Sequence, residues 1–88
     1  MNNAPKVGEK YYHFKHDSNK DNLNYCYEIF GVATHSETRQ EMVIYKPLYK
    51  CEIELFVRPL DMFLEIVNKQ EYNYLGPRFR LAGQILEK

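Results

Sequence analysis

The sequence predicts a mainly β fold, a small barrel of about five strands with one short helix. Tyrosine and phenylalanine, which favour strands, number 8 and 5 among 88 residues, whereas glycine and proline number only 4 each. Apolar and polar residues alternate with a period of two in several short runs, and one stretch changes to the helical period. A chain of 88 residues is short even for one domain, so we expect a single domain with its core at about 7–82 and tails at 1–6 and 84–88.

Two strands are expected in the first half of the chain. Residues alternate in Val7–Lys15, where Phe14 is the expected core residue. The polar stretch His16–Asn24 cannot bury apolar area and is expected to be a loop. Leu23–Thr34 is partly apolar on both faces, which suits a strand of a small closed barrel, and Gly31 can mark the bulge at which the sheet bends.

Two further strands are expected after a polar turn at His35–Gln40. The apolar run resumes at Glu41–Leu48, so the segment has the outline of a hairpin. Pro47 cannot donate a hydrogen bond to a sheet and should lie at the end of a strand or at an edge. Glu52–Val57 alternates cleanly and predicts the next strand. Its side chains expected to point inward are Ile53, Leu55 and Val57.

One short helix is expected at Pro59–Lys69. Its apolar residues at helical spacing are Leu60, Phe63, Leu64 and Val67. Proline suits the first turn of a helix because its missing N–H would be unpaired there, and Asp61 lies near the positive end of the helix dipole. Residues 72–82 alternate again around a Gly76-Pro77 break and predict a last strand that closes the sheet.

Charge and hydropathy exclude several classes of protein. The chain has 12 Lys and Arg against 12 Asp and Glu, without the basic stripe that duplex DNA-binding proteins use. The longest stretch free of these charged residues is Ile29–Ser36, far short of the roughly 18 apolar residues of a membrane helix. The first residues lack the apolar region of a signal peptide. We therefore expect a cytoplasmic protein that does not enter a membrane.

No metal ion or cofactor is expected. Cys26 and Cys51 are far apart and form no Cys-x-x-Cys pair, which favours two reduced thiols over a disulfide. His13 and His16 form a His-x-x-His pair, yet on a strand these side chains face opposite sides and cannot hold one tetrahedral ion without a bend.

Five blocks of the sequence resemble a known family. They are Tyr11-x-His13-Phe14-Lys15, Val32-Ala33-x-His35-Ser36-Glu37-Thr38, Val43-Ile44-Tyr45-x-x-Leu48-Tyr49, Val57-Arg58-Pro59-x-x-Met62-Phe63 and Pro77-Arg78-Phe79. In this order, from about Gly8 to Phe79, the chain resembles the bacterial domain of unknown function family 1653. The resemblance implies a small SH3-like barrel, and it implies no biochemical activity.

Three positions depart from the pattern of this family. The His16–Asn24 segment is longer than the usual link, so a groove beside that hairpin would be reshaped. Lys50 stands where the family has a glycine, which puts the backbone geometry of that turn in doubt. Phe56 replaces a typical tryptophan, which keeps a large apolar ring but loses an indole N–H donor.

The run His35-Ser36-Glu37 contains the residue types of a hydrolytic triad. Consecutive residues cannot form one, because a triad needs three side chains that converge in space. A hairpin turn in which the Ser36 and Thr38 hydroxyls bond backbone amides is the favoured interpretation. The alternative is a binding role, in which His35, Glu37 and a tyrosine such as Tyr45 or Tyr49 present a polar rim to a ligand.

The arginines also have two interpretations. Arg58, Arg78 and Arg80 can each receive a carboxylate or phosphate in bidentate fashion. For Arg58 we favour a structural ion pair with Glu37, Asp61 or another nearby carboxylate, which would pin the strand to the helix. An exposed patch of tyrosines is a further open possibility, and its candidate members are Tyr11, Tyr25, Tyr27, Tyr45 and Tyr49. The candidate ligand-binding residues are His13, His35, Glu37, Tyr45, Tyr49, Arg58 and Arg78.

These residues favour a non-catalytic binding module that recognises a peptide, protein or nucleotide-bearing partner. One alternative is an RNA-associated barrel that stacks single-stranded bases on tyrosines and binds phosphates with Arg58, Arg78 and Arg80. Another is a small enzyme subunit with His13 or His35 as acid or base. A monomer and a homodimer are both compatible with the sequence.

Overall fold

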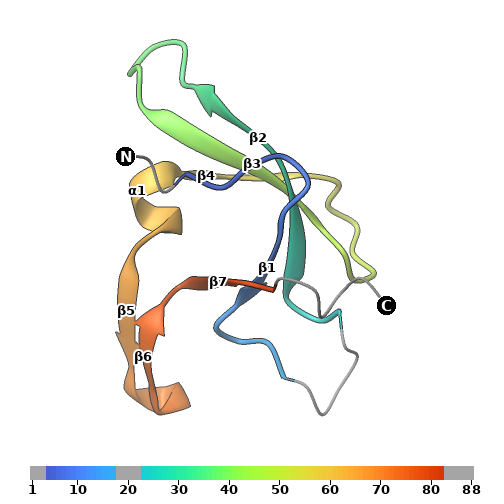
Figure 1. Cartoon of the computed structure of the whole chain (residues 1–88), viewed down its shortest axis with the longest axis vertical. Helices are drawn as coiled ribbons and strands as arrows, with labels where there is room; N and C mark the ends of the chain where they lie inside the picture. Colours follow the sequence, from blue (N-terminus) through green and yellow to red (C-terminus); the bar gives the residue numbers. More distant parts are fainter. Residues whose placement is uncertain (1–3, 18–22, 83–88) are drawn as a thin grey trace.

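The computed structural model describes residues 4–17 and 23–82, which form a mainly β fold, as predicted (Figure 1). The elements are β1 (Lys10–His13), β2 (Cys26–Thr34), β3 (Glu41–Pro47), β4 (Phe56–Pro59), α1 (Leu60–Phe63), β5 (Ile66–Lys69), the 3-10 helix η1 (Gln70–Tyr72), β6 (Tyr74–Pro77) and β7 (Phe79–Leu81). The expected tails at 1–3 and 84–88, and residues 18–22 of the expected loop, lie outside the described residues. Pro5, expected in a tail, is buried.

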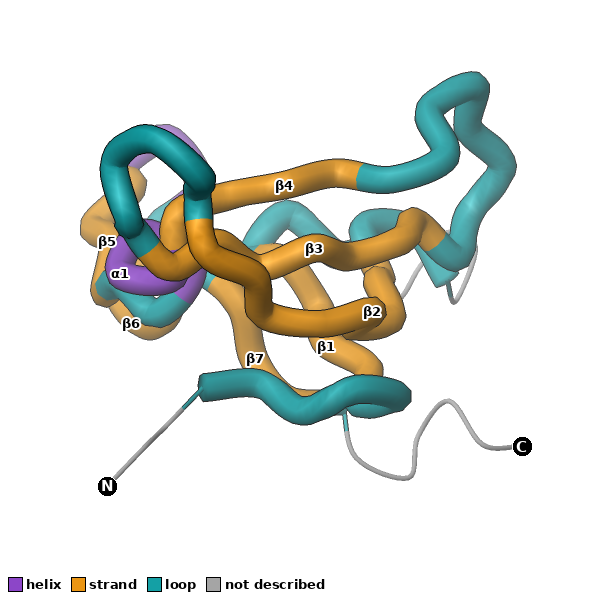
Figure 2. The backbone as a smooth tube through the Cα atoms, turned by 90° about the horizontal axis from the view of Figure 1, so that it is seen from above, coloured by secondary structure: helices purple, strands orange, loops and turns teal. Residues whose placement is uncertain are grey.

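The strands form two antiparallel sheets. The larger has five strands in the order β4-β3-β2-β1-β7, which Figure 2 follows from β4 at the top to β7 below, and the smaller pairs β5 with β6. The larger sheet is strongly curled, so that its two edge strands approach each other. The Arg58 guanidinium of one edge strand lies 5.6 Å from the ring centroid of Phe79 on the other. Among the described strands this contact is made by side chains, without backbone pairing. The SH3-like barrel stays a prediction.

A β-bulge in β2 bends the larger sheet at the predicted place. Ile29 pairs with Tyr45 and Gly31 pairs with Ile44, so Phe30 is an extra residue on one strand. Bulges of this kind increase the local twist and re-aim the strand. The half of β2 before the bulge carries buried side chains, and the half beyond it is mostly exposed.

The core is an aromatic cluster inside the curl. Its buried members are Tyr27, Ile29, Val43, Tyr45, Phe63 and Phe79, with Tyr11, Tyr49, Phe56 and Leu60 packed around them. The rings of Phe63 and Phe79 stack with centroids 4.1 Å apart and an interplanar angle of 6°. Tyr11 meets Phe63 edge-on at 5.3 Å. The short helix α1 therefore delivers one ring, that of Phe63, into the concave side of the sheet.

The predicted helix is present, but it is shorter than expected. It ends at Phe63 instead of continuing to Lys69, and Leu64 is 40% exposed. Val67 is buried as predicted, although it lies on strand β5. The β-branched residues Ile66 and Val67 prefer strands, and pairing with β6 gives their backbone hydrogen bonds that a helix would have had to supply.

The predicted inward face of β4 was wrong. Ile53, Leu55 and Val57 are 47%, 47% and 59% exposed, whereas Phe56 packs against the core. The strand begins only at Phe56, and a shift of one residue in phase moves every side chain to the opposite face. The turn before it is irregular, so the alternation at Glu52–Val57 did not continue into the paired strand.

Phe14 is not a core residue either. It lies just beyond the end of β1, is only partly buried, and packs against Tyr72 and Tyr74 with ring centroids 5.4 and 5.5 Å away. The residue of β1 that packs on the core is Tyr11.

The described part of the chain contains no helix long and apolar enough to cross a membrane. Within the same residues, no group of three or more His, Cys, Asp or Glu side chains is placed to hold a metal ion. Cys26, which is buried, and Cys51, which is exposed, do not form a disulfide with each other. His16 lies beyond β1, where its Nδ1 is 2.7 Å from the Asn24 carbonyl oxygen.

Substitutions of Phe63 and Leu64 distinguish the predicted longer helix, in which both side chains face the core, from the observed helix, which ends at Phe63. Phe63→Ala should lower the free energy of unfolding by about 3–5 kcal/mol, because it empties the centre of the core. Leu64→Ala should cost less than about 1 kcal/mol, because its side chain is half-exposed. Urea unfolding of both variants measures this difference, and equal losses would contradict the observed end of α1.

Candidate functional site

Two pockets share a wall on the concave side of the larger sheet. The aromatic pocket, of about 250 Å³, is lined by His13, Lys15, Tyr25, Tyr27, Tyr45, Tyr49, Phe56, Arg58 and Phe79. The basic pocket, of about 350 Å³, is lined by His13, Phe14, Lys15, Arg58, Lys69, Glu71, Tyr72 and Arg78. Three residues line both pockets: His13, Lys15 and Arg58. This shared wall is the centre of the candidate site.

The curl of the sheet brings these side chains together from distant parts of the chain. The pairing of β1 with β2 extends one residue before the start of β2, because the N–H of His13, the last residue of β1, donates to the Tyr25 carbonyl oxygen at 2.8 Å. Pairing of β4 with β3 aligns Arg58 with Val43, two residues along each strand from the pair of Tyr45 and Phe56 and so on the same face. The ends of β1, β2 and β4 therefore meet at one end of the aromatic core.

Arg58 is held by aromatic residues. Its Nε donates to the Tyr45 hydroxyl at 3.2 Å, and its guanidinium lies 5.6 Å from the Phe79 ring centroid. The expected ion pair with Glu37 or Asp61 was wrong, since the ion pair within residues 4–17 and 23–82 joins Arg78 to Glu65. The two terminal nitrogens of Arg58 accordingly have no protein carboxylate as a partner in the described part of the chain.

His13 is a neutral hydrogen-bond donor in this site. Its Nδ1 accepts the backbone N–H of Lys15 at 3.1 Å, so the ring proton of the neutral form is on Nε2. Burial, assisted by the positive charges of Arg58, Lys15 and Arg78, lowers the pKa of His13 to about 4 from its ordinary 6.5. At neutral pH the imidazole offers an N–H without adding charge.

The tyrosine hydroxyls line the floor of the aromatic pocket. Tyr27 and Tyr49 share a hydrogen bond of 2.9 Å between their hydroxyls. Burial raises the pKa of Tyr27 and that of Tyr49, so both hydroxyls stay protonated at neutral pH. The rings of Tyr45 and Phe56 stack at 5.6 Å and form the opposite wall.

Arg78 lines the basic pocket but also serves the fold. Its terminal nitrogen bonds the Glu65 carboxylate at 2.9 Å, and its backbone N–H donates to the Glu65 carbonyl oxygen at 2.8 Å. The Phe14 N–H donates to the Arg78 carbonyl oxygen at 3.0 Å. Its Nε is buried with no acceptor among the described residues. Arg78 therefore links the start of β7 to β1 and to the segment after α1.

His35 and Glu37 are not part of either pocket. Both lie in the exposed turn between β2 and β3, at the top of Figure 1. His35 Nδ1 accepts the backbone N–H groups of Glu37 and Thr38 at 3.1 and 3.3 Å, and the Thr38 hydroxyl oxygen accepts that of Gln40 at 3.2 Å. The turn interpretation is confirmed for the Thr38 hydroxyl, whereas the other two amides bond His35 instead of the predicted Ser36 hydroxyl. The structure does not bring His35 and Glu37 to Tyr45 or Tyr49.

Sequence reasoning found part of this site and missed the rest. Of the predicted residues, the structure brings His13, Tyr45, Tyr49 and Arg58 to the aromatic pocket and Arg78 to the basic one. The lining residues absent from the predicted binding residues are Phe14, Lys15, Tyr25, Tyr27, Phe56, Lys69, Glu71, Tyr72 and Phe79. Of these, Tyr25 and Tyr27 were named only as members of the possible tyrosine patch. The strand period gives no signal for Lys15, because it lies in the turn after β1, where the His16 N–H donates to the His13 carbonyl oxygen at 2.9 Å.

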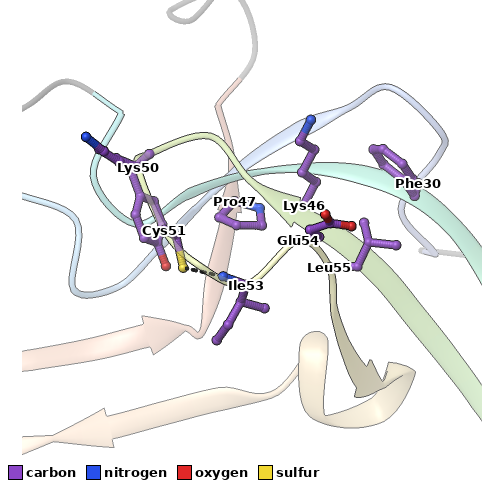
Figure 3. A pocket seen from close by; sticks show the side chains of 9 residues that line it. Phe30, Lys46, Pro47, Lys50, Cys51, Ile53, Glu54 and Leu55 are labelled. Atoms are coloured by element: carbon purple, nitrogen blue, oxygen red, sulfur yellow. Dashed lines mark hydrogen bonds between the residues drawn. The ribbon is translucent and has the colours of Figure 1, made fainter.

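A larger pocket, of about 570 Å³, lies elsewhere, along the segment between β3 and β4. Figure 3 shows Lys50 and Cys51 at one end and Phe30 and Leu55 at the other, with Lys46 and Glu54 between them. The Cys51 sulfur accepts the Ile53 N–H at 3.4 Å. Lysines and a carboxylate alternate with half-exposed apolar side chains here, so the lining does not select one charge in a ligand.

The comparison with protein families is decisive for the chain as a whole. The model of the family described as Protein of unknown function (DUF1653) matches residues 9–81. Neither the curated proteins nor the solved structures contain a significant match. Because the matched region covers β1 to β7 and with them both pockets, the chain belongs to the DUF1653 family of proteins of unknown function.

Proposed function

We propose that the protein is a non-catalytic binding module, which holds an anionic group of a partner in the basic pocket and an attached flat group in the aromatic pocket. The observation that carries this proposal is the state of Arg58. Its guanidinium lines both pockets, yet within the described residues it is held by Tyr45 and Phe79 rather than by a carboxylate. An arginine fixed through Nε keeps its terminal nitrogens for an external anion.

The local charge supports an anionic ligand. The basic pocket is lined by four cationic side chains and one carboxylate. The cations are Lys15, Arg58, Lys69 and Arg78, and the carboxylate is Glu71. The whole chain has a formal net charge of +0, so this cluster is a local concentration of positive charge on a neutral protein. Such a cluster attracts anions at short range and gives little non-specific attraction to a polyanion.

The donor chemistry supports binding over catalysis. His13 Nδ1 is occupied by the Lys15 N–H, which leaves the imidazole as a donor through Nε2. A general base needs a free lone pair near the reacting proton and is usually oriented by a carboxylate. The carboxylate among the lining residues, Glu71, stands in the basic pocket with cations around it. A peptide, a protein or a nucleotide-bearing molecule of the cytosol can supply the anionic group.

Arg58 tests the proposal directly. Arg58→Gln should leave a folded domain and weaken the binding of inorganic phosphate about tenfold or more, since a hydrogen bond to a charged group is lost. The measurement is a titration with phosphate followed by the amide resonances of His13, Lys15 and Arg58. Arg80→Gln is the matched control, because Arg80 lies over the Tyr12 ring at 5.5 Å and lines neither pocket. Equal affinity in the Arg58 variant would contradict the proposal.

His13 should give the domain a defined response to pH. Since its pKa is about 4 in the folded protein and 6.5 ordinarily, the unfolded chain takes up this proton first as the pH falls. The contribution of His13 to stability is therefore complete above pH 6.5 and is lost as the pH falls to about 4. Urea midpoints measured across this window should fall less steeply for His13→Gln than for the wild type. Parallel curves would contradict the shifted pKa.

A further inference from the structure

The tyrosine hydroxyls of the aromatic pocket carry more protons than their hydrogen bonds within the protein use. Tyr27, Tyr45 and Tyr49 carry three hydroxyl protons, and one of them is used between Tyr27 and Tyr49. Tyr45 accepts a proton from Arg58 Nε and does not donate to it. Two hydroxyl protons therefore remain without a protein acceptor within the described residues. All three tyrosines line the aromatic pocket, so a ligand ring with acceptor atoms can accept these protons, and a purely apolar ring cannot.

All groups that converge on the shared wall are donors as well. They are the terminal nitrogens of Arg58, the ammonium of Lys15 and Nε2 of His13. An anionic group next to an acceptor-bearing ring satisfies both parts of the site at once. A phenyl ring that carries an anion satisfies the shared wall but leaves the tyrosine hydroxyls of the floor unpaired.

Tyr25 lies at the mouth of the aromatic pocket in an unfavourable backbone conformation. Its φ is 55°, in the left-handed region that bulky residues avoid and that glycine or asparagine adopts more readily. Its ring is 39% exposed, although it lines the pocket. Ring centroids of His13 and Tyr49 lie 5.7 and 6.0 Å away. A strained residue that keeps a large ring half-exposed beside a set of unpaired donors suggests a role in binding.

Hydrogen bonds on both sides of Tyr25 hold this conformation. The Cys26 N–H donates to the Leu23 carbonyl oxygen at 3.0 Å, which closes the turn before β2. The Tyr25 carbonyl oxygen accepts the His13 N–H at 2.8 Å. The backbone of Tyr25 is therefore fixed relative to His13, and its ring packs between those of His13 and Tyr49. A ring that is placed in advance loses little freedom when a ligand stacks on it.

We propose that the ligand is a nucleotide, whose phosphate binds Arg58, Lys15 and His13 while its base lies against the tyrosines, with Tyr25 as the residue on which it stacks. This inference rests on the proposed function and makes it specific. The base supplies acceptor atoms for the two tyrosine hydroxyl protons that have no protein acceptor among the described residues. The nucleotide is either free or part of a single strand, because both present the same phosphate and base.

The test compares ligands that differ by one group. Inorganic phosphate, ribose 5-phosphate, uridine 5′-monophosphate, adenosine 5′-monophosphate, phosphotyrosine and a uridine tetranucleotide are titrated into the full chain and followed by amide resonances. We expect a nucleotide to bind about fivefold or more tightly than ribose 5-phosphate, the gain of one stacked base. A tetranucleotide that binds more tightly than the monophosphates identifies a single strand as the source, and equal binding identifies a free nucleotide.

Two variants at one position separate stacking from structure. Tyr25→Phe keeps the ring and should keep nucleotide affinity within about twofold, whereas Tyr25→Asn should abolish the gain from the base. Because asparagine tolerates the left-handed conformation, Tyr25→Asn should also have an unchanged or higher Tm. A lower Tm in Tyr25→Asn, with the base gain retained, would identify Tyr25 as a purely structural residue and overturn its proposed role.

The outcomes distinguish this inference from the proposed function. If phosphate binds at Arg58 but nucleotides bind no more tightly than ribose 5-phosphate, the proposed function stands and the nucleotide inference fails. If phosphotyrosine binds more tightly than the nucleotides, the ring does not need acceptor atoms and the inference also fails. If none of the probes shifts the resonances of the shared wall, the proposed function itself is wrong.

Discussion

The curl of the larger sheet, packed from inside by the aromatic cluster, is the constraint on which the rest of the structure depends. Arg58 of β4 reaches across to Phe79 of β7 and is fixed on the way by Tyr45 of β3. Side chains thereby complete a curl that backbone pairing leaves open among the described strands. The stacked rings of Phe63 and Phe79 fill its interior. Arg58, which spans this gap, also lines both pockets. The curl that packs the core therefore also brings the side chains of the site together.

Local sequence patterns predicted much of this fold, and they failed where two patterns compete. The bulge near Gly31 and the turn at His35–Gln40 depend on neighbouring residues, and both were predicted. The end of α1 depends on a distant partner, because β5 exists only through its pairing with β6. The inward face of β4 was predicted wrongly for a similar reason. An irregular segment before Phe56 breaks the alternation, and only the pairing with β3 sets the face of Phe56.

The site was predictable in its chemistry and less so in its membership. His13 and Arg58 stand out in the sequence by residue type, and the structure places both in the shared wall. Sequence reasoning named Tyr25 only among five tyrosines of a possible patch, because the backbone conformation that distinguishes it from the others is one that its residue type argues against. The sequence also could not show that Arg58 forms no ion pair within the described residues, since it offers as many acids as bases.

The bulge in β2 separates the hairpin from the core. Beyond it, side chains from Val32 to Glu41 are exposed, and the turn is held by its own hydrogen bonds. Closing a longer loop costs little additional entropy, and exposed turns tolerate inserted residues better than any other part of a domain. The hairpin tip is therefore the natural point at which to attach a fluorophore or graft a foreign epitope, since neither pocket nor the aromatic core would register the addition.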